Sequence, residues 1–158
     1  GSADEAAVAL NGFIDRLEPL PRLSRALLGW MIDESEHRYG FNDDHVVNAD
    51  LVQRKYPDTQ NLLIDTRLLE AWGFLSYDDD QDGKSARFSF SFPGADHDWF
   101  AEAFMNFAKE QKLSAATLFS TMNFSAFGPL PLVSTSITTR AKKAGRVKST
   151  GRSKAQQR

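Results

Sequence analysis

Apolar side chains recur at three- and four-residue intervals near the start of the chain, and this spacing predicts two amphipathic helices. In the first, over positions 3–17, the periodic residues are Val8, Leu10, Phe13, Ile14 and Leu17. In the second, over positions 22–35, they are Leu23, Ala26, Leu27, Trp30 and Met31. Pro19 and Pro21 separate the two helices, because proline disfavours helical backbone at the residue before it.

The pattern changes between positions 45 and 92. A short apolar strand at 45–47 leads into an amphipathic helix at 48–56, which Pro57 and Asp58 end. The next helix directs leucines toward one side, and these are Leu62, Leu63, Leu68 and Leu69. Gly73 ends it, and positions 74–77 and 86–92 are predicted as two strands around an Asp/Gly turn.

This order of elements over 45–92 resembles the winged helix-turn-helix. The resemblance implies an α+β fold in which one helix is held in the major groove of DNA. We expect a domain over 3–132 with this core and with additional helices at both ends. The opening positions 1–2, Gly-Ser, are typical of a protease-cleavage remnant.

Beyond the core, the pattern predicts a helix from Asp96 or Asp98 to about Lys112 and a shorter one ending near Phe124. The first has a broad aromatic face formed by Trp99, Phe100, Ala103, Phe104 and Phe107. Such a stripe is a core face, a ligand-binding wall or a subunit interface. Because it exceeds what a small winged-helix core needs, we expect a homodimer that places two recognition helices at two half-sites.

The net charge of −2 conceals an uneven distribution. The basic residues after position 136 are Arg140, Lys142, Lys143, Arg146, Lys148, Arg152, Lys154 and Arg158, with no acidic residue among them. Positions 1–136 then hold 11 basic and 21 acidic residues, a net charge of −10. The segment 133–158 is too polar to offset its ordering entropy, so we expect a disordered basic tail. If the tail neutralises up to eight phosphates, its log–log salt slope would be as steep as about −7.

The third helix of the core is the candidate for reading bases. Its expected exposed residues are Thr59, Gln60, Asn61, Thr66 and Arg67. Gln and Asn pair with adenine edges, Thr contacts a thymine methyl group and Arg bridges guanine. Arg54 and Lys55 at the end of the preceding helix, with Lys84 and Arg87 at the wing, are expected phosphate contacts. Asp58, Asp65 and Glu70 oppose this function, because they repel phosphate, and ordinary solvated helix-start residues are the alternative for Gln60 and Asn61.

The turn over 78–85 has three interpretations. Its aspartates are unfavourable for a wing that touches DNA backbone. Asp78, Asp80 and Asp82 alternate as in a calcium loop, but the twelfth position is Ser89 and the flanking segments are predicted strands. A solvated hairpin turn with Asp-Gly chemistry is favoured.

Other chemistry lacks a pattern. His37, His45 and His97 lie in separate segments, and there is no cysteine. No serine lies in a nucleophile elbow, and Gly83-Lys84-Ser85 lacks the upstream glycine of a phosphate-binding loop. We therefore expect no catalysis, cofactor or metal. The absence of cysteine and of a long apolar run favours a cytoplasmic protein.

The leading hypothesis is a non-enzymatic DNA-binding protein of bacterial type, a transcriptional regulator or a replication or partition accessory factor. The alternative is a winged helix that binds protein through its acidic body, as an adaptor or as an inhibitor of a DNA-binding protein. A small enzyme or ligand sensor with a pocket under the aromatic helix is a third hypothesis.

Overall fold

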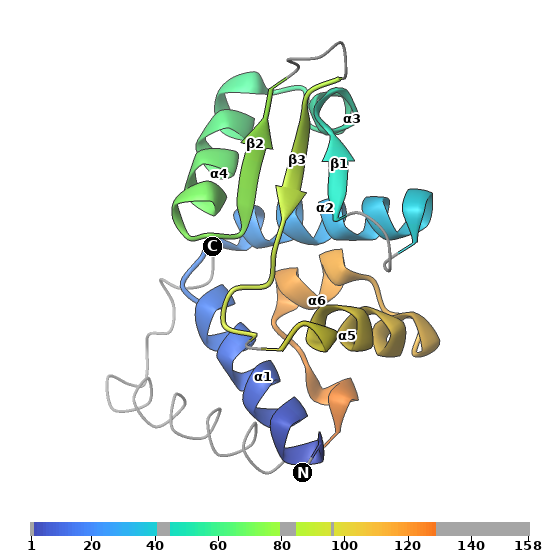
Figure 1. The fold of residues 1–158 in the computed structure, drawn as a ribbon. Coiled ribbons are helices and arrows are strands. Elements are labelled where there is room, and N and C mark those ends of the chain that lie inside the picture. Colours follow the sequence, from blue (N-terminus) through green and yellow to red (C-terminus); the bar gives the residue numbers. More distant parts are fainter. Residues whose placement is uncertain (1, 41–44, 80–84, 96, 129–158) are drawn as a thin grey trace, which may run out of the picture.

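The computed structural model describes residues 2–40, 45–79, 85–95 and 97–128. These residues form six α-helices and a three-stranded antiparallel sheet (Figure 1). In chain order the elements are α1 (Ser2–Leu17), α2 (Arg22–Tyr39), β1 (Val46–Asn48), α3 (Ala49–Lys55), α4 (Thr59–Ala71), β2 (Leu75–Asp78), β3 (Arg87–Phe90), α5 (Trp99–Glu110), α6 (Ala115–Thr121) and a 3₁₀ turn (Ser125–Phe127). The predicted α+β class is confirmed. No helix among these residues is long and apolar enough to cross a membrane.

The sheet has the strand order β1-β3-β2, so the last strand lies between the other two. Phe88 pairs with Val47 on one side and with Tyr77 on the other. Phe88 and Phe90 are buried while Arg87 and Ser89 are partly exposed, which is the alternation of a sheet with one face on a core. In Figure 1, α2 crosses below the sheet, α4 lies beside β2, and α1, α5 and α6 lie on the other side of α2. This arrangement is compatible with a winged helix.

Local turn chemistry explains how α4 begins and ends. The Asp58 side chain accepts a hydrogen bond from the backbone N–H of Asn61, which satisfies a free donor of the first turn. At the other end Gly73 adopts a φ of 87°, a left-handed conformation that glycine takes without steric cost. The N–H of Phe74 then bonds the carbonyl of Leu69, as in a Schellman motif. The chain therefore reverses directly into β2.

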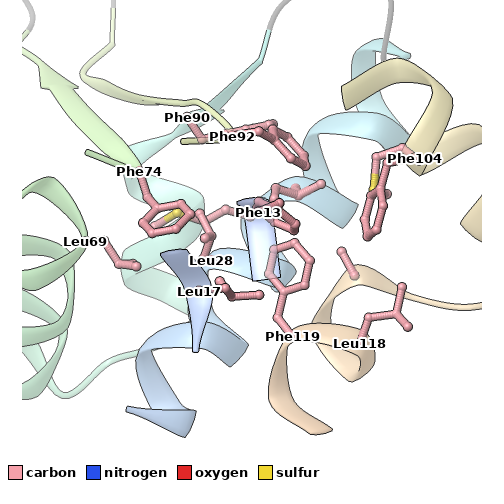
Figure 2. Packing of buried hydrophobic residues seen from close by; sticks show 14 of the residues in the cluster. Phe13, Leu17, Leu28, Leu69, Phe74, Phe90, Phe92, Phe104, Leu118 and Phe119 are labelled. Carbon is pink, nitrogen blue, oxygen red and sulfur yellow. The ribbon is translucent and has the colours of Figure 1, made fainter. Parts of the chain in front are cut away.

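Aromatic residues from α5, from α6 and from the segments next to β2 and β3 form one core around Phe13 of α1 (Figure 2). Its ring lies 5.0 Å from that of Phe92, 5.7 Å from that of Phe104 and 5.4 Å from that of Phe119. Phe100 and Phe104 of the aromatic stripe on α5 are thus buried in the core of a single chain, and Phe107 is partly buried. These residues are therefore not available to a dimer interface, and the expected homodimer stays a prediction. Two expected members differ, since Ala103 is exposed and Trp99 is 39% exposed.

Charged side chains of α2 hold both ends of α6. The Asp33 carboxylate accepts hydrogen bonds from the N–H groups of Ala115 and Ala116, at 2.8 and 2.9 Å. Buried Arg25 donates to the carbonyls of Phe119 and Ser120 where α6 ends. The Asp33 carboxylate thus lies at the positive N-terminal end of the α6 dipole, and the Arg25 guanidinium lies at its negative C-terminal end. Gly29 lies between them, and a Cβ there would be only 2.5 Å from the Ala115 carbonyl oxygen.

The structure corrects several element ends. α2 continues to Tyr39 instead of ending at Ser35, and the last helix ends at Thr121 instead of near Phe124. β3 ends at Phe90, although Phe92 is buried. The larger correction concerns Leu63, which was expected to face inward but is 49% exposed. Leu62, Leu63 and Ile64 are consecutive, and one face of a helix has no room for all three.

Candidate nucleic-acid interface

Two of the three predicted base-reading residues at the start of α4 bond within the chain. The Asn61 side chain donates to the Asp58 carboxylate at 2.7 Å. The Thr59 hydroxyl accepts from the Gln53 side chain at 3.2 Å, which joins α3 to α4. Gln60 is exposed and makes no side-chain hydrogen bond to another described residue. All three residues are exposed, and among them only Gln60 has a side chain without a hydrogen bond to another described residue.

The outward face of α4 continues from Gln60 through apolar residues to Arg67. Ile64 is 62% exposed and Leu63 is 49% exposed. Arg67 is exposed, as predicted. Thr66 was expected to be exposed as well, but it is only 3% exposed. Its hydroxyl donates to the Leu63 carbonyl at 3.2 Å, so this polar residue satisfies its hydrogen bond on the inner side of the helix.

A groove of about 510 Å³ separates α4 from the β2–β3 hairpin. Its lining residues are Ala49, Gln53, Thr59, Leu62, Leu63, Thr66, Arg67, Glu70, Tyr77 and Phe88. Of the predicted base-reading residues, Thr59, Thr66 and Arg67 belong to this lining, whereas Gln60 and Asn61 do not. Leu63, Glu70 and Tyr77 join them in the lining, and no motif in the sequence indicates this.

The predicted phosphate contacts on α3 lie elsewhere. Arg54 borders a second hollow of about 340 Å³, together with Arg38 and Tyr39 at the end of α2. Arg54 and Lys55 are exposed, while Arg38 is paired with Glu34 at 2.7 Å. Arg54 therefore lies at the second hollow, whereas Arg67 lies in the groove between α4 and the hairpin.

The described part of the β2–β3 hairpin has an acidic surface, which is unfavourable for a wing that contacts phosphate. Arg87, a predicted phosphate contact, forms an ion pair with Asp78 at 3.2 Å. Asp78 and Asp79 are both exposed. Lys84, most of the Asp/Gly turn over 78–85 and the basic tail with Arg140, Lys142, Lys143, Arg146 and Lys148 lie outside the described residues. The contributions of these residues stay predictions.

The titratable side chains of the described residues are the candidates for metal ligands and for acid–base groups. Within those residues no three His, Asp or Glu side chains are grouped to hold a metal ion. His45 stacks on Phe90 at 5.3 Å and His97 on Trp99 at 5.4 Å, which are packing contacts. Near the α3–α4 turn, burial and the Asp65 charge raise the pKa of the Tyr56 hydroxyl above its ordinary value of 10.0.

Comparison of the chain with protein-family models, with curated proteins and with solved structures found no match. Its function is therefore inferred from the geometry and charge of the site.

Proposed function

We propose that the chain is a winged helix-turn-helix protein that binds double-stranded DNA through α4, without enzymatic activity. The observation that carries the proposal is the order α2-β1-α3-α4-β2-β3 together with the sheet order β1-β3-β2. In a winged helix these elements are the first helix, the first strand, the helix-turn-helix pair and the wing hairpin. In this proposal α4 is the recognition helix.

The outward face of α4 supports this proposal. Gln60 and Arg67 are seven residues apart, two helical turns, so both lie on the exposed side. Their side chains match the amide that pairs with adenine and the guanidinium that bridges guanine. Arg54 and Lys55 add exposed positive charge at the end of α3. The basic tail supplies sequence-independent affinity for phosphates in this proposal, which offsets the acidic body.

Fluorescence anisotropy with a random-sequence duplex across a salt series tests the proposal. The full chain is compared with a chain that ends at Leu132. We expect both to bind and the full chain to have the steeper salt slope. Loss of all binding on truncation would assign the affinity to the tail alone and would contradict a role for α4.

A second candidate function, protein recognition by the same fold, is favoured by a specific observation. Leu63, Ile64 and Tyr77 are exposed apolar residues around α4, and exposed Asp78 and Asp79 lie beside them on the hairpin. Tyrosine and aliphatic side chains are typical of a protein interface, whereas aspartates repel DNA. Asp79→Lys separates the two functions: it should tighten DNA binding and make its salt slope steeper by about 0.9 for one added phosphate contact. An unchanged DNA affinity would favour protein recognition.

A further inference from the structure

The groove between α4 and the hairpin has two apolar walls. Leu62 and Leu63 form the wall on α4, and Tyr77 and Phe88 form the wall on the sheet. The Tyr77 and Phe88 rings contact each other with centroids 5.3 Å apart. Small-molecule sites in proteins have volumes of about 300–1,000 Å³ and mostly apolar linings. At about 510 Å³ this groove has the volume of such a site, and five of its ten lining residues are apolar or aromatic.

The polar groups of the groove differ in whether they are already satisfied. Gln53 and Thr59 are hydrogen-bonded to each other, and Thr66 is bonded to the Leu63 carbonyl. The Arg67 side chain, in contrast, has no ion pair or hydrogen bond to any other residue in the described part of the chain. Arg54, Lys55 and Lys112 are in the same state but lie outside the groove lining, whereas Arg38, Arg87 and Lys109 are each paired with a carboxylate.

An unpaired guanidinium beside apolar walls selects a particular ligand chemistry. The planar fork of Arg67 matches a carboxylate, which it binds with two parallel hydrogen bonds. Glu70 lies on the same lining one helical turn away and disfavours a more highly charged anion such as a phosphate dianion. The apolar walls require that the rest of the ligand be aromatic or aliphatic.

We propose that the groove binds a small aromatic carboxylate, with the ring between the Leu62–Leu63 wall and the Tyr77–Phe88 wall and the carboxylate on Arg67. Arg67 also belongs to the proposed DNA-reading face, so a bound carboxylate would compete with DNA for the same side chain. This competition rests on the proposed function, whereas the binding itself does not.

Binding is tested with 3-phenylpropionate as the probe, by NMR titration and calorimetry on the full chain. The neutral amide 3-phenylpropanamide lacks the charge, and acetate lacks the ring. We expect saturable binding of 3-phenylpropionate with shift changes at Leu62, Leu63, Tyr77 and Phe88, and much weaker binding of both control compounds. No saturable binding, or shift changes confined to other residues, would overturn the proposal.

Arg67→Gln provides the decisive variant, because Arg67 is exposed and its replacement leaves the core intact. Removing a charge-assisted pair should weaken binding about 10- to 100-fold. Arg54→Gln is the matched control, since Arg54 is also an exposed helical arginine but lies outside the groove lining. Equal binding by wild type and Arg67→Gln would overturn the proposal.

A DNA anisotropy experiment with added 3-phenylpropionate distinguishes failure of this inference from failure of the proposed function. If the chain binds 3-phenylpropionate but no DNA, the groove site stands and the proposed function is overturned. If the chain binds DNA but no 3-phenylpropionate, only the groove site is overturned. Displacement of DNA in wild type supports both proposals.

Discussion

Gly29→Ala tests how closely α2 and α6 approach. A Cβ at this position would lie 2.5 Å from the Ala115 carbonyl oxygen and 2.6 Å from the Ala116 Cα atom. Ordinary van der Waals contacts are 3.4–4 Å, so the methyl group would be about 1 Å too close to backbone atoms. Because those atoms belong to a helix, the two helices have to separate.

The expected cost is the balance of three contributions. Overpacking a tight contact costs about 1–3 kcal/mol. Separation also lengthens the Asp33 and Arg25 hydrogen bonds to α6, and a hydrogen bond to a charged group contributes about 1.5–3 kcal/mol. The better helix propensity of alanine offsets about 1 kcal/mol. We therefore expect the free energy of unfolding to fall by about 2–4 kcal/mol.

Urea denaturation, followed by circular dichroism, measures this change in the free energy of unfolding. The slope of that free energy against urea concentration should be the same in both proteins. Ala26→Gly on the same helix is the control, because it measures the propensity contribution at a half-buried position without the clash. If Gly29→Ala is as stable as wild type or more stable, the close approach of α2 and α6 is wrong.

Two further predictions concern stability. Leu63→Ser should change the free energy of unfolding by no more than about 0.5 kcal/mol, since Leu63 is half exposed. Leu69→Ala in the core should lower it by about 2–5 kcal/mol. Similar urea midpoints for the two variants would contradict the orientation of α4. Burial raises the pKa of Asp33 above its ordinary value of 3.8, despite two backbone hydrogen bonds that lower it. The folded state then holds this proton more tightly than the unfolded state, so the contribution of Asp33 is full below pH 3.8 and decreases as pH rises through the raised pKa. Wild type should therefore lose stability relative to Asp33→Asn from about pH 3.8 upward in urea titrations, and the opposite trend would show that the hydrogen bonds outweigh burial.

Periodicity and turn chemistry were sufficient to predict the main elements. The stripe through Phe13 and Leu17 placed α1, and the Pro57-Asp58 and Gly73 signals bounded α4. Periodicity did not determine which residue of the run 62–64 faces the core, because neighbouring helical positions differ by only about 100°. The orientation of α4 depends on packing against α2 and β2, where Ser24 donates to Asp65 at 2.8 Å.

The candidate site was only partly predictable. The resemblance to a winged helix predicts that Gln60 and Arg67 lie on the exposed face of α4, and both are exposed. The groove was missed because it depends on the separation between α4 and a hairpin that follows it in the chain. The contacts of Arg25 and Asp33 with the ends of α6 were also missed, since their partners are backbone groups 82–95 residues away. Backbone hydrogen-bonding partners leave no pattern of residue types in a sequence.

In the proposed function α4 contacts DNA, and an NMR titration of the full chain with a short duplex tests this claim. We predict that the largest shift changes fall on Gln60, Ile64 and Arg67, and that Arg67→Glu removes them while Lys112→Glu, an exposed charge reversal between α5 and α6, leaves them in place. Shift changes confined to residues outside α4, or unchanged by Arg67→Glu, would contradict the claim.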